Sequence, residues 1–310
     1  MKKTAFLCSG QGSQYAGMGK ELFDQFTSAR RVYECGSDIL GFDLAKISFE
    51  GSDADLAPTG VSQPAIFAVS MAAYYAALEF CEPGAFAGHS LGEYAALTAA
   101  GAFSLENGFR VISARAAAMQ RAADENPGSM FAILGSDEAT VTQVCEETEG
   151  YVLPVNYNSL NQTVIAGEVE AAQKAADVLL AKGAKKAVKL AVSSAFHSRM
   201  MASAAEELKE RMAGIPISTP EKPFYSNVTG KLLEPGTDLP AYLARHLVSP
   251  VRFHEEVSVM LGDGITRFVE LGPNKVLATL VKRSFEQAEA YNVENLKTLE
   301  KARAAFAQNE

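Results

Sequence analysis

The stretch FAGHSLGEYAALTAAGAF, residues 86–103, sets a serine between two glycines and then runs into an alanine-rich segment. The apolar residues before the serine predict a short buried strand, and the residues from about Leu91 predict a helix. Ser90 therefore falls at a strand-to-helix turn, where side chains at Gly88 and Gly92 would collide with neighbouring backbone. The turn presents a hydroxyl group at a helix N-terminus, which favours developing negative charge. The pattern predicts Ser90 as a nucleophile and the Leu91 N–H as an oxyanion donor.

The order of predicted elements indicates an α/β protein with one insertion. Before residue 127 and after residue 195, predicted strands alternate with helices, which favours a mostly parallel sheet. Residues 127–195 instead show the order strand, helix, two strands, helix, strand, which is that of a ferredoxin-like unit. We therefore predict a larger unit of residues 1–126 and 196–310 and an inserted unit of residues 127–195. Segments 221–233 and 265–273 are predicted core strands, and a polar, fraying helix is predicted after Leu299.

The charge balance argues against polyanionic partners. The 310-residue chain has 28 Lys and Arg against 37 Asp and Glu, a formal net charge of −9. A chain of that sign is not expected to bind nucleic acid or an anionic membrane surface as a whole.

The lengths of the apolar runs and the spacing of the cysteines predict the cellular compartment. The run Ala5–Cys8 falls short of the roughly 7–15 apolar residues of a secretory signal. The longest run, Pro64–Leu78, is shorter than the roughly 20 residues of a membrane span, so a buried helix is predicted. Four scattered cysteines without a C-x-x-C pair or a neighbouring histidine predict no metal site and a reducing cytoplasm.

A serine nucleophile needs a base, and the chain has four histidines. His197 follows the last strand of the inserted unit, where the chain re-enters the larger unit, so it is the predicted base. His89 adjoins Ser90 but should point away from it on a tight turn. His246 and His254 are predicted to lie at the surface or to fill packing roles.

The chain offers no obvious acid to complete a triad. Asp263 is a conventional candidate, but it follows the histidine in the chain, whereas α/β-hydrolases run Ser, Asp, His. A backbone carbonyl could orient the imidazole instead and give a dyad.

The helix predicted from Leu105, with Ser104 as its N-cap, carries an arginine in an unusual place. At about 100° per residue, Arg110 and Arg121 fall opposite the apolar stripe, whereas Arg115 falls at its border. An arginine aimed at the interior pairs with a carboxylate or phosphate of a ligand, or with a glutamate of the chain itself. The residues alone leave both alternatives open.

Six motifs occur in order along nearly the whole chain: GQGSQ at 10–14, GHSLGEY at 88–94, Arg115, NYNSLNQTVIAGE at 156–168, AFHS at 195–198 and SPVRF at 249–253. Together they resemble the malonyl-CoA:acyl carrier protein transacylases of bacterial fatty acid synthesis, which are related to polyketide synthase acyltransferase domains. The resemblance implies an α/β-hydrolase-like core with a ferredoxin-like insertion. It also implies that malonyl-CoA acylates the serine and that the phosphopantetheine thiol of the carrier protein then takes the malonyl group.

The resemblance assigns roles to matching positions. Ser90 is the nucleophile and His197 the general base and acid, while Gln11 and Leu91 supply oxyanion-hole N–H groups. Arg115 pairs with the malonyl carboxylate, and no metal or cofactor is expected.

Two positions depart from the family pattern. The resemblance places a histidine-orienting backbone carbonyl at His246, where the family usually has glutamine. Leu160 stands where many relatives have proline. Asn158 is predicted at the cleft rim, and Phe196 is predicted to crowd an α-methyl group and so favour malonyl over methylmalonyl.

The carrier protein of this family is acidic, so docking on an acidic enzyme needs a local basic patch. The candidate docking residues are Lys185, Lys186, Lys282 and Arg283. The family leans to monomers. Alternatives are a stand-alone polyketide synthase acyltransferase, an acyl hydrolase of the same fold, which would lack the arginine, and a non-catalytic carrier-binding module.

Overall fold

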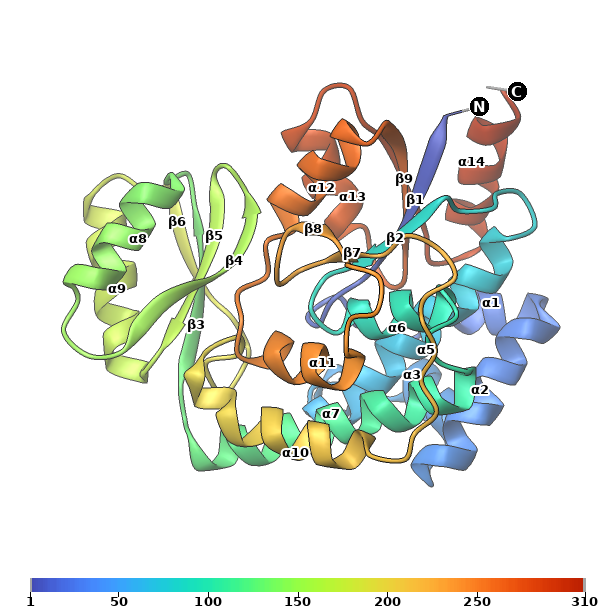
Figure 1. Cartoon of the computed structure of the whole chain (residues 1–310), viewed down its shortest axis with the longest axis horizontal. Coiled ribbons are helices and arrows are strands. Elements are labelled where there is room, and N and C mark those ends of the chain that lie inside the picture. The colour runs from blue at the N-terminus through green and yellow to red at the C-terminus, as the bar shows by residue number, and fades with distance from the viewer. Residues whose placement is uncertain (1, 309–310) are drawn as a thin grey trace.

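Two β-sheets form the framework of the protein (Figure 1). The computed structural model describes residues 2–308. The core sheet has the order β10-β9-β1-β2, and all of its pairings are parallel. Its strands are β1 (Lys3–Cys8), β2 (Ala85–Gly88), β9 (Ile265–Leu271) and β10 (Glu289–Val293). Residues Ala5, Phe6 and Leu7 of β1 are fully buried, as expected for a parallel strand covered on both faces.

The second sheet is antiparallel, with the order β4-β5-β3-β6. Its strands are β3 (Ser129–Leu134), β4 (Val152–Ser159), β5 (Gln162–Gly167) and β6 (Lys186–Lys189). With helices α8 (Glu138–Glu147) and α9 (Val169–Ala181) they follow the predicted strand, helix, two strands, helix, strand order. The predicted α/β class with a parallel core and an inserted antiparallel unit is therefore confirmed. The exact unit boundaries stay a prediction.

The two faces of the small sheet have different partners. Phe131, Ile133 and Ile165 belong to the apolar cluster under α8 and α9. Met130, Ala132 and Val164, which alternate with them along the strands, belong instead to the main core cluster. The small sheet is thus attached to the core through one face. Figure 1 shows it at the left, with the core helices and sheet to its right.

The remaining elements surround the core sheet. Between β1 and β3 these are α1 (Lys20–Gln25), α2 (Thr27–Leu40), α3 (Leu44–Glu50), α4 (Asp53–Leu56), α5 (Thr59–Ala77), α6 (Gly92–Ala99) and α7 (Leu105–Glu125). After β6 they are the 3₁₀ turn Arg199–Met201, α10 (Ala202–Met212), β7 (Tyr225–Ser226), β8 (Lys231–Leu232), α11 (Leu239–Leu247), α12 (Phe253–Gly262), α13 (Val276–Ser284) and α14 (Leu296–Ala307).

The helix predicted over Pro64–Leu78 is confirmed as α5, which begins a few residues earlier at Thr59. Its residues are buried around most of its circumference, so it is a core helix. Within residues 2–308, no helix combines the length and the apolar character that crossing a membrane requires.

Two predictions for the C-terminal part were wrong, and one strand was not predicted. Segment 221–233 forms only the two-residue hairpin β7–β8 and a single bridge from Phe224 to Phe86, because the chain turns back at Gly230, whose φ is 66°. Strand β10 was not anticipated. The last helix is not a fraying polar one, because Leu299, Ala302 and Phe306 form a buried face.

The chain leaves and re-enters the core at adjacent points. The Gly128 N–H donates to the Ser193 carbonyl (3.0 Å), and the Ser194 hydroxyl donates to the Asn126 carbonyl (2.7 Å). His197 comes directly after this crossing and therefore lies at the junction of the two sheets.

Candidate active site

The turn between β2 and α6 holds Ser90 in a left-handed backbone conformation, with φ of 54°. A Cβ at position 88 would lie 2.1 Å from the Gly92 carbonyl carbon, and one at position 92 would lie 2.1 Å from the Cys8 carbonyl oxygen. The predicted collisions are therefore confirmed. Non-glycine residues with positive φ are uncommon and persist where the surroundings hold them, as in active sites.

Ser90 and His197 form a hydrogen-bonded pair. The serine Oγ lies 2.7 Å from His197 Nε2. On the other side of the ring, Nδ1 lies 3.1 Å from the carbonyl oxygen of His246 and 3.0 Å from that of Ser249. Both of these atoms are acceptors, so the proton resides on Nδ1 and leaves Nε2 free to accept from the serine.

Backbone carbonyls therefore take the place of a triad acid. The Asp263 alternative is wrong, because its carboxylate accepts a hydrogen bond from the Tyr225 hydroxyl (2.6 Å) and His197 Nδ1 is occupied by two carbonyls. The histidine and serine form a dyad.

The electrostatics of the dyad favour a neutral imidazole. Burial lowers the pKa of His197 to about 3, and the nearby Arg115 charge acts in the same direction. At neutral pH the ring is therefore uncharged and able to take a proton.

Arg115, which lies on α7, also contacts Ser90 Oγ. Its side chain is fully buried, and Nη2 donates to Ser90 Oγ at 3.0 Å. Its Nε and Nη1 atoms have no hydrogen-bond partner among the described residues, and it forms no salt bridge with any described carboxylate. The guanidinium carbon lies 5.1 Å from the centre of the Tyr94 ring. Of the two alternatives for Arg115, the internal salt bridge is wrong, and the guanidinium is available to an anionic ligand.

The Gly10–Gly12 loop lies beside the nucleophilic turn. A Cβ at position 10 would lie 2.8 Å from the His89 carbonyl oxygen, which measures how closely the two backbones approach. The Gln11 side chain accepts a hydrogen bond from Gln63 Nε2 (3.2 Å) on α5. Gln63 is a contact that the sequence analysis missed. The Gln11 and Leu91 N–H groups remain predicted oxyanion donors.

A pocket of about 660 Å³ reaches Phe196, the residue before the base, although Ser90 and His197 are not among its lining residues. Gln11 and Phe196, both singled out from the sequence, line it together with Gln120 and the segment 189–193. Phe196 precedes the base directly and is only 7% exposed.

The remaining histidines make separate contacts. His89 Nε2 lies 2.8 Å from Asn158 Oδ1, so this side chain points toward the small sheet and not toward Ser90 Oγ. Asn158 itself is buried. His254 stacks on Phe285 with a centroid distance of 4.8 Å, which fits the predicted packing role.

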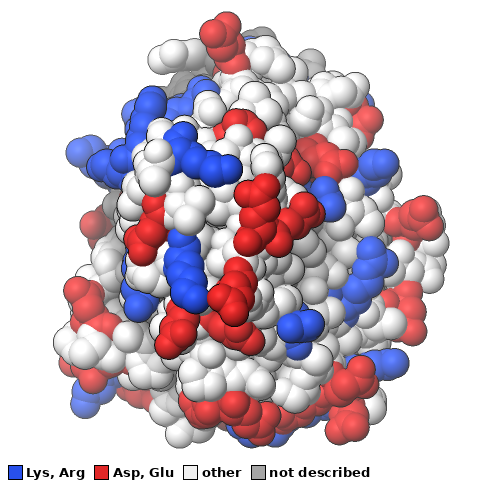
Figure 2. Space-filling view, turned by 90° about the vertical axis from the view of Figure 1, so that its left-hand side faces the viewer, with Lys and Arg blue, Asp and Glu red and all other residues white. Residues whose placement is uncertain are grey.

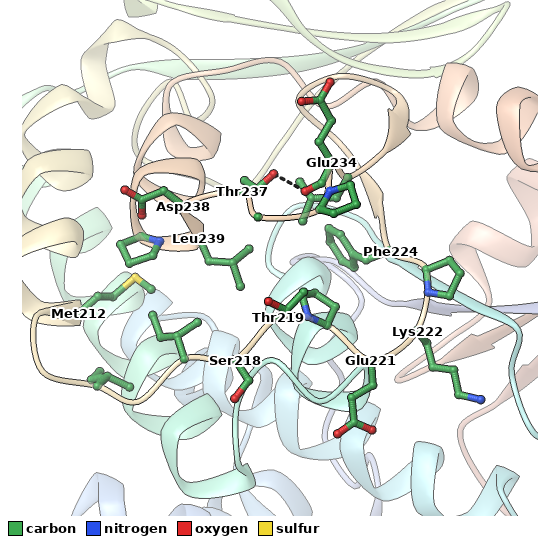
Figure 3. Close-up of a pocket in the computed structure, with 18 of the residues that line it drawn as sticks. Met212, Ser218, Thr219, Glu221, Lys222, Phe224, Glu234, Thr237, Asp238 and Leu239 are labelled. Atoms are coloured by element: carbon green, nitrogen blue, oxygen red, sulfur yellow. Dashed lines mark hydrogen bonds between the residues drawn. The ribbon is translucent and has the colours of Figure 1, made fainter.

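A second and larger pocket lies apart from this chemistry. It has a volume of about 840 Å³ and is lined only by residues between 209 and 240, from the end of α10 to the start of α11 (Figure 3). Figure 3 shows its polar groups, including the Thr237 hydroxyl that donates to the Glu234 carbonyl. It contains no histidine or cysteine and none of the predicted site residues.

Behind the Ser90 turn lies a buried polar cluster that the sequence analysis did not anticipate. Its members are Glu93, Asn227, Tyr242, His246 and Glu256. Burial raises the pKa of Glu93 to about 8 and raises that of Glu256, while it lowers the pKa of His246. In each of these groups burial disfavours the charged form, as expected for polar side chains removed from water.

The four candidate docking residues lie on separate elements. Lys185 and Lys186 are exposed at the start of β6, whereas Lys282 and Arg283 are in the last turn of α13. Lys282 lies 5.8 Å from the centre of the Tyr291 ring. On the face formed by the small sheet and its helices, basic and acidic side chains are interspersed, with several basic ones gathered at the upper left of Figure 2.

Within the described range, no group of three or more His, Cys, Asp or Glu side chains could hold a metal ion. The groups that the structure brings together at Ser90 Oγ are the His197 imidazole and the Arg115 guanidinium.

The sequence profile of the acyl transferase domain family matches residues 5–308. The chain belongs to this family. It is 38% identical over 306 residues to the malonyl CoA-acyl carrier protein transacylase of Bacillus subtilis strain 168, covering 97% of this chain and 96% of the relative.

Solved structures give the same assignment. The MCAT of Streptococcus pneumoniae superposes with a TM-score of 0.92 at 36% identity, covering 98% of this chain and 100% of that one. A malonyl-transacylase solved in complex with a type II PKS acyl-carrier protein (PlMCAT:AntF, holo form) superposes with a TM-score of 0.93 at 36% identity, covering 98% and 99%. The resemblance stated from the six motifs is confirmed, and the chain is an acyltransferase.

Proposed function

We propose that this chain transfers the malonyl group of malonyl-CoA to the phosphopantetheine thiol of acyl carrier protein, supplying extender units for fatty acid synthesis. One observation carries the proposal. Ser90 Oγ is hydrogen-bonded at once to a neutral base, His197, and to a buried guanidinium with unused donors, Arg115. A nucleophile, its base and a receptor for a carboxylate therefore meet at one atom.

In the first half-reaction, Ser90 Oγ attacks the thioester carbonyl carbon while His197 Nε2 takes the hydroxyl proton. The negative charge that develops on the carbonyl oxygen is stabilised by the N–H groups of Gln11 and Leu91. The carbon–sulfur bond then breaks, and the CoA sulfur leaves with the proton from His197. The product is malonyl-Ser90 and free CoA.

The second half-reaction runs the same steps in reverse. His197 takes the proton of the carrier-protein thiol, and its sulfur attacks the ester carbonyl. The ester carbon–oxygen bond breaks and Ser90 Oγ regains a proton from His197. The carbonyls of His246 and Ser249 hold the ring in one tautomer throughout.

Arg115 links substrate identity to this chemistry. The malonyl carboxylate pairs with the guanidinium and offsets the charge that holds down the pKa of His197, so the base becomes stronger when the right substrate is bound. A neutral acyl group leaves the buried charge unpaired, at a cost of about 3–5 kcal/mol.

Two alternatives are less favoured. An acyl hydrolase of the same fold would lack the arginine that lies here against Ser90. A polyketide carrier protein is the less favoured acceptor, because the full-length curated relatives are named malonyl CoA-acyl carrier protein transacylases.

The proposal extends to the docking surface, the oligomeric state and the compartment. The carrier protein docks through Lys185, Lys186, Lys282 and Arg283 near the cleft. The protein acts as a cytoplasmic monomer without metal or cofactor, and its four free cysteines suit a reducing compartment.

The test is incubation with radiolabelled malonyl-CoA followed by mass spectrometry of the Ser90 peptide. A malonyl adduct should form on Ser90, be absent in Ser90→Ala, and move to carrier protein faster than water removes it. An adduct on another residue, or label lost only to water, would contradict the proposal.

A further inference from the structure

The strained turn at Ser90 is held from behind by one side-chain amide. Asn227 Nδ2 donates to the Gly88 carbonyl at 2.6 Å, and Asn227 Oδ1 accepts from the Ser90 N–H at 2.8 Å. A single amide thus bridges the residues before and after His89, and it satisfies two backbone groups that the turn leaves without a strand partner.

Asn227 reaches the turn because the segment before it is hydrogen-bonded to β2. The Phe86 N–H of β2 donates to the Pro223 carbonyl (2.8 Å), and Phe86 bridges Phe224 in parallel. Beyond this bridge, where β2 runs into the turn, no described residue gives it a further backbone hydrogen bond on this side. The Asn227 side chain continues the hydrogen bonding that a strand would otherwise supply.

The orientation of the amide is fixed by its surroundings. Nδ2 faces two acceptors, the Gly88 carbonyl and Glu256 Oε2 (3.0 Å), whereas Oδ1 faces the Ser90 N–H, which can only donate. The Asn227 N–H donates to Glu93 Oε1 (2.6 Å), and its carbonyl accepts from the Arg252 N–H (2.9 Å). Asn227 is fully buried, so water cannot replace these contacts.

We propose that Asn227 is a positioning residue for the nucleophile, which holds the Ser90 backbone so that Oγ meets His197 Nε2 and the Leu91 N–H faces the oxyanion. This rests on the proposed role of Ser90 as the acylated residue. Asn227 does not touch Arg115, which binds the carboxylate, so its contribution lies in the rate of acylation and not in the affinity for malonyl-CoA.

The experiment measures malonyl-Ser90 formation in single-turnover kinetics, with the acylation rate constant and the malonyl-CoA Kd fitted separately. Asn227→Ala should acylate about 100-fold more slowly with an unchanged Kd, because small misplacements of a nucleophile cost that much. Ser226→Ala is the matched control. Ser226 is the neighbouring fully buried residue, and its Oγ accepts hydrogen bonds from Tyr242 and Val228 without touching the turn.

Both variants should lose thermal stability, but Ser226→Ala should acylate at nearly the parent rate. Equal rate losses in the two variants would assign Asn227 a merely structural role and overturn the proposal. A loss confined to Kd would overturn it as well. Ser90→Ala, run alongside, separates these outcomes from failure of the proposed function, because an adduct that persists there disproves the nucleophile itself.

A second variant gives a pH signature. Asn227→Asp replaces the donor to the Gly88 carbonyl with an acceptor, and protonation of the new carboxyl restores a donor. Its acylation rate should therefore rise as pH falls, while that of the parent does not. The ionisable groups in contact with Asn227 are Glu93 of α6, Glu256 of α12 and His246 of α11. Tyr242 of α11 contacts Glu93 and the neighbouring Ser226. A parallel profile in the two proteins would count against the proposal.

Discussion

The two sides of the Ser90 turn differ in how their polar groups are occupied. On the side of the dyad, the Ser90 hydroxyl contacts His197 and Arg115, and Arg115 Nε and Nη1 have no hydrogen-bond partner among residues 2–308. On the opposite side, every polar group of Asn227, the residue that contacts the turn, has a partner within the protein. Farther from the turn, His246 Nδ1 and Glu256 Oε1 have no hydrogen-bond partner among the described residues. We call the side with Ser90 Oγ, His197 and Arg115 the front of the site, and the side with Asn227 and its polar neighbours the back. The front is arranged to exchange hydrogen bonds with a substrate, whereas the back is arranged to keep its geometry.

The largest expected effect comes from removing the base at the front. His197→Ala should lower the rate of malonyl-Ser90 formation by about 10²–10⁴-fold, the usual contribution of general acid–base catalysis. Single-turnover kinetics measure it. A loss below tenfold would show that another group takes the serine proton.

Arg115→Ala should remove most of the discrimination between malonyl-CoA and acetyl-CoA. The kcat/KM ratio of the two substrates should fall by about 10²–10³-fold, because the pairing of a buried charge is lost. Arg110→Ala, on the exposed face of the same helix, is the control and should keep the parent ratio. If the ratio survives in Arg115→Ala, the carboxylate is recognised elsewhere.

The pH dependence of kcat/KM reports whether His197 is a neutral, buried base. Because burial and Arg115 hold the pKa of His197 at about 3, kcat/KM for malonyl-CoA should stay level from neutral pH down to pH 5. A histidine of ordinary pKa would be mostly protonated there and would cost about 30-fold. In Arg115→Gln the pKa of His197 rises, so the decline should begin at higher pH. A parent profile that bends near pH 6.5 would contradict the buried, neutral base.

The Phe196 ring is predicted to exclude an α-methyl group of the substrate. Phe196→Ala should raise kcat/KM for methylmalonyl-CoA relative to malonyl-CoA by about tenfold or more, the usual worth of one methyl group in a pocket. Comparable values for both substrates in the parent protein would refute the crowding by this ring.

The smallest effect is expected at the back. His246→Gln should leave the acylation rate within a few-fold of the parent, because His197 Nδ1 contacts the His246 carbonyl and not its ring. The same kinetics measure it. A large loss would mean that the imidazole itself matters, either through the His197 ring 5.2 Å away or through its 3.4 Å contact with Asn227 Oδ1.

The front of the site was largely predictable from the sequence. Glycine spacing located Ser90, helical phase located Arg115, and the position of His197 after the insertion pointed to the cleft. Each of these signals is local, so the residues that carry it are close together in the chain.

The back of the site was not predictable in the same way. Asn227 lies 137 residues from Ser90 in the chain, and the sequence predicts a core strand for its segment. Its role depends on a bridge between Phe224 and Phe86, which no local pattern encodes. The edge strand β10 is short and only partly buried, so it gave no clear alternation. For α14, by contrast, the 3–4 spacing of Leu299, Ala302 and Phe306 is a local helical signal, and the prediction of a polar helix does not take it into account.

The crossing at Gly128 and Ser193 has a consequence for engineering. Because the outgoing and returning chains are hydrogen-bonded side by side, the small unit has two neighbouring covalent connections to the larger one. One face of its sheet also packs on the main core, so an exchange of the unit between relatives must preserve that packing, which includes Met130, Ala132 and Val164. Gly128 must be kept in any such graft, since a Cβ there would lie 2.8 Å from the Ala195 nitrogen and 2.7 Å from the Gly167 oxygen. Recombination at the Gly128–Ser193 crossing would exchange Asn158 and the strand before Phe196. Ser90, Arg115 and Asn227 would remain those of the recipient protein.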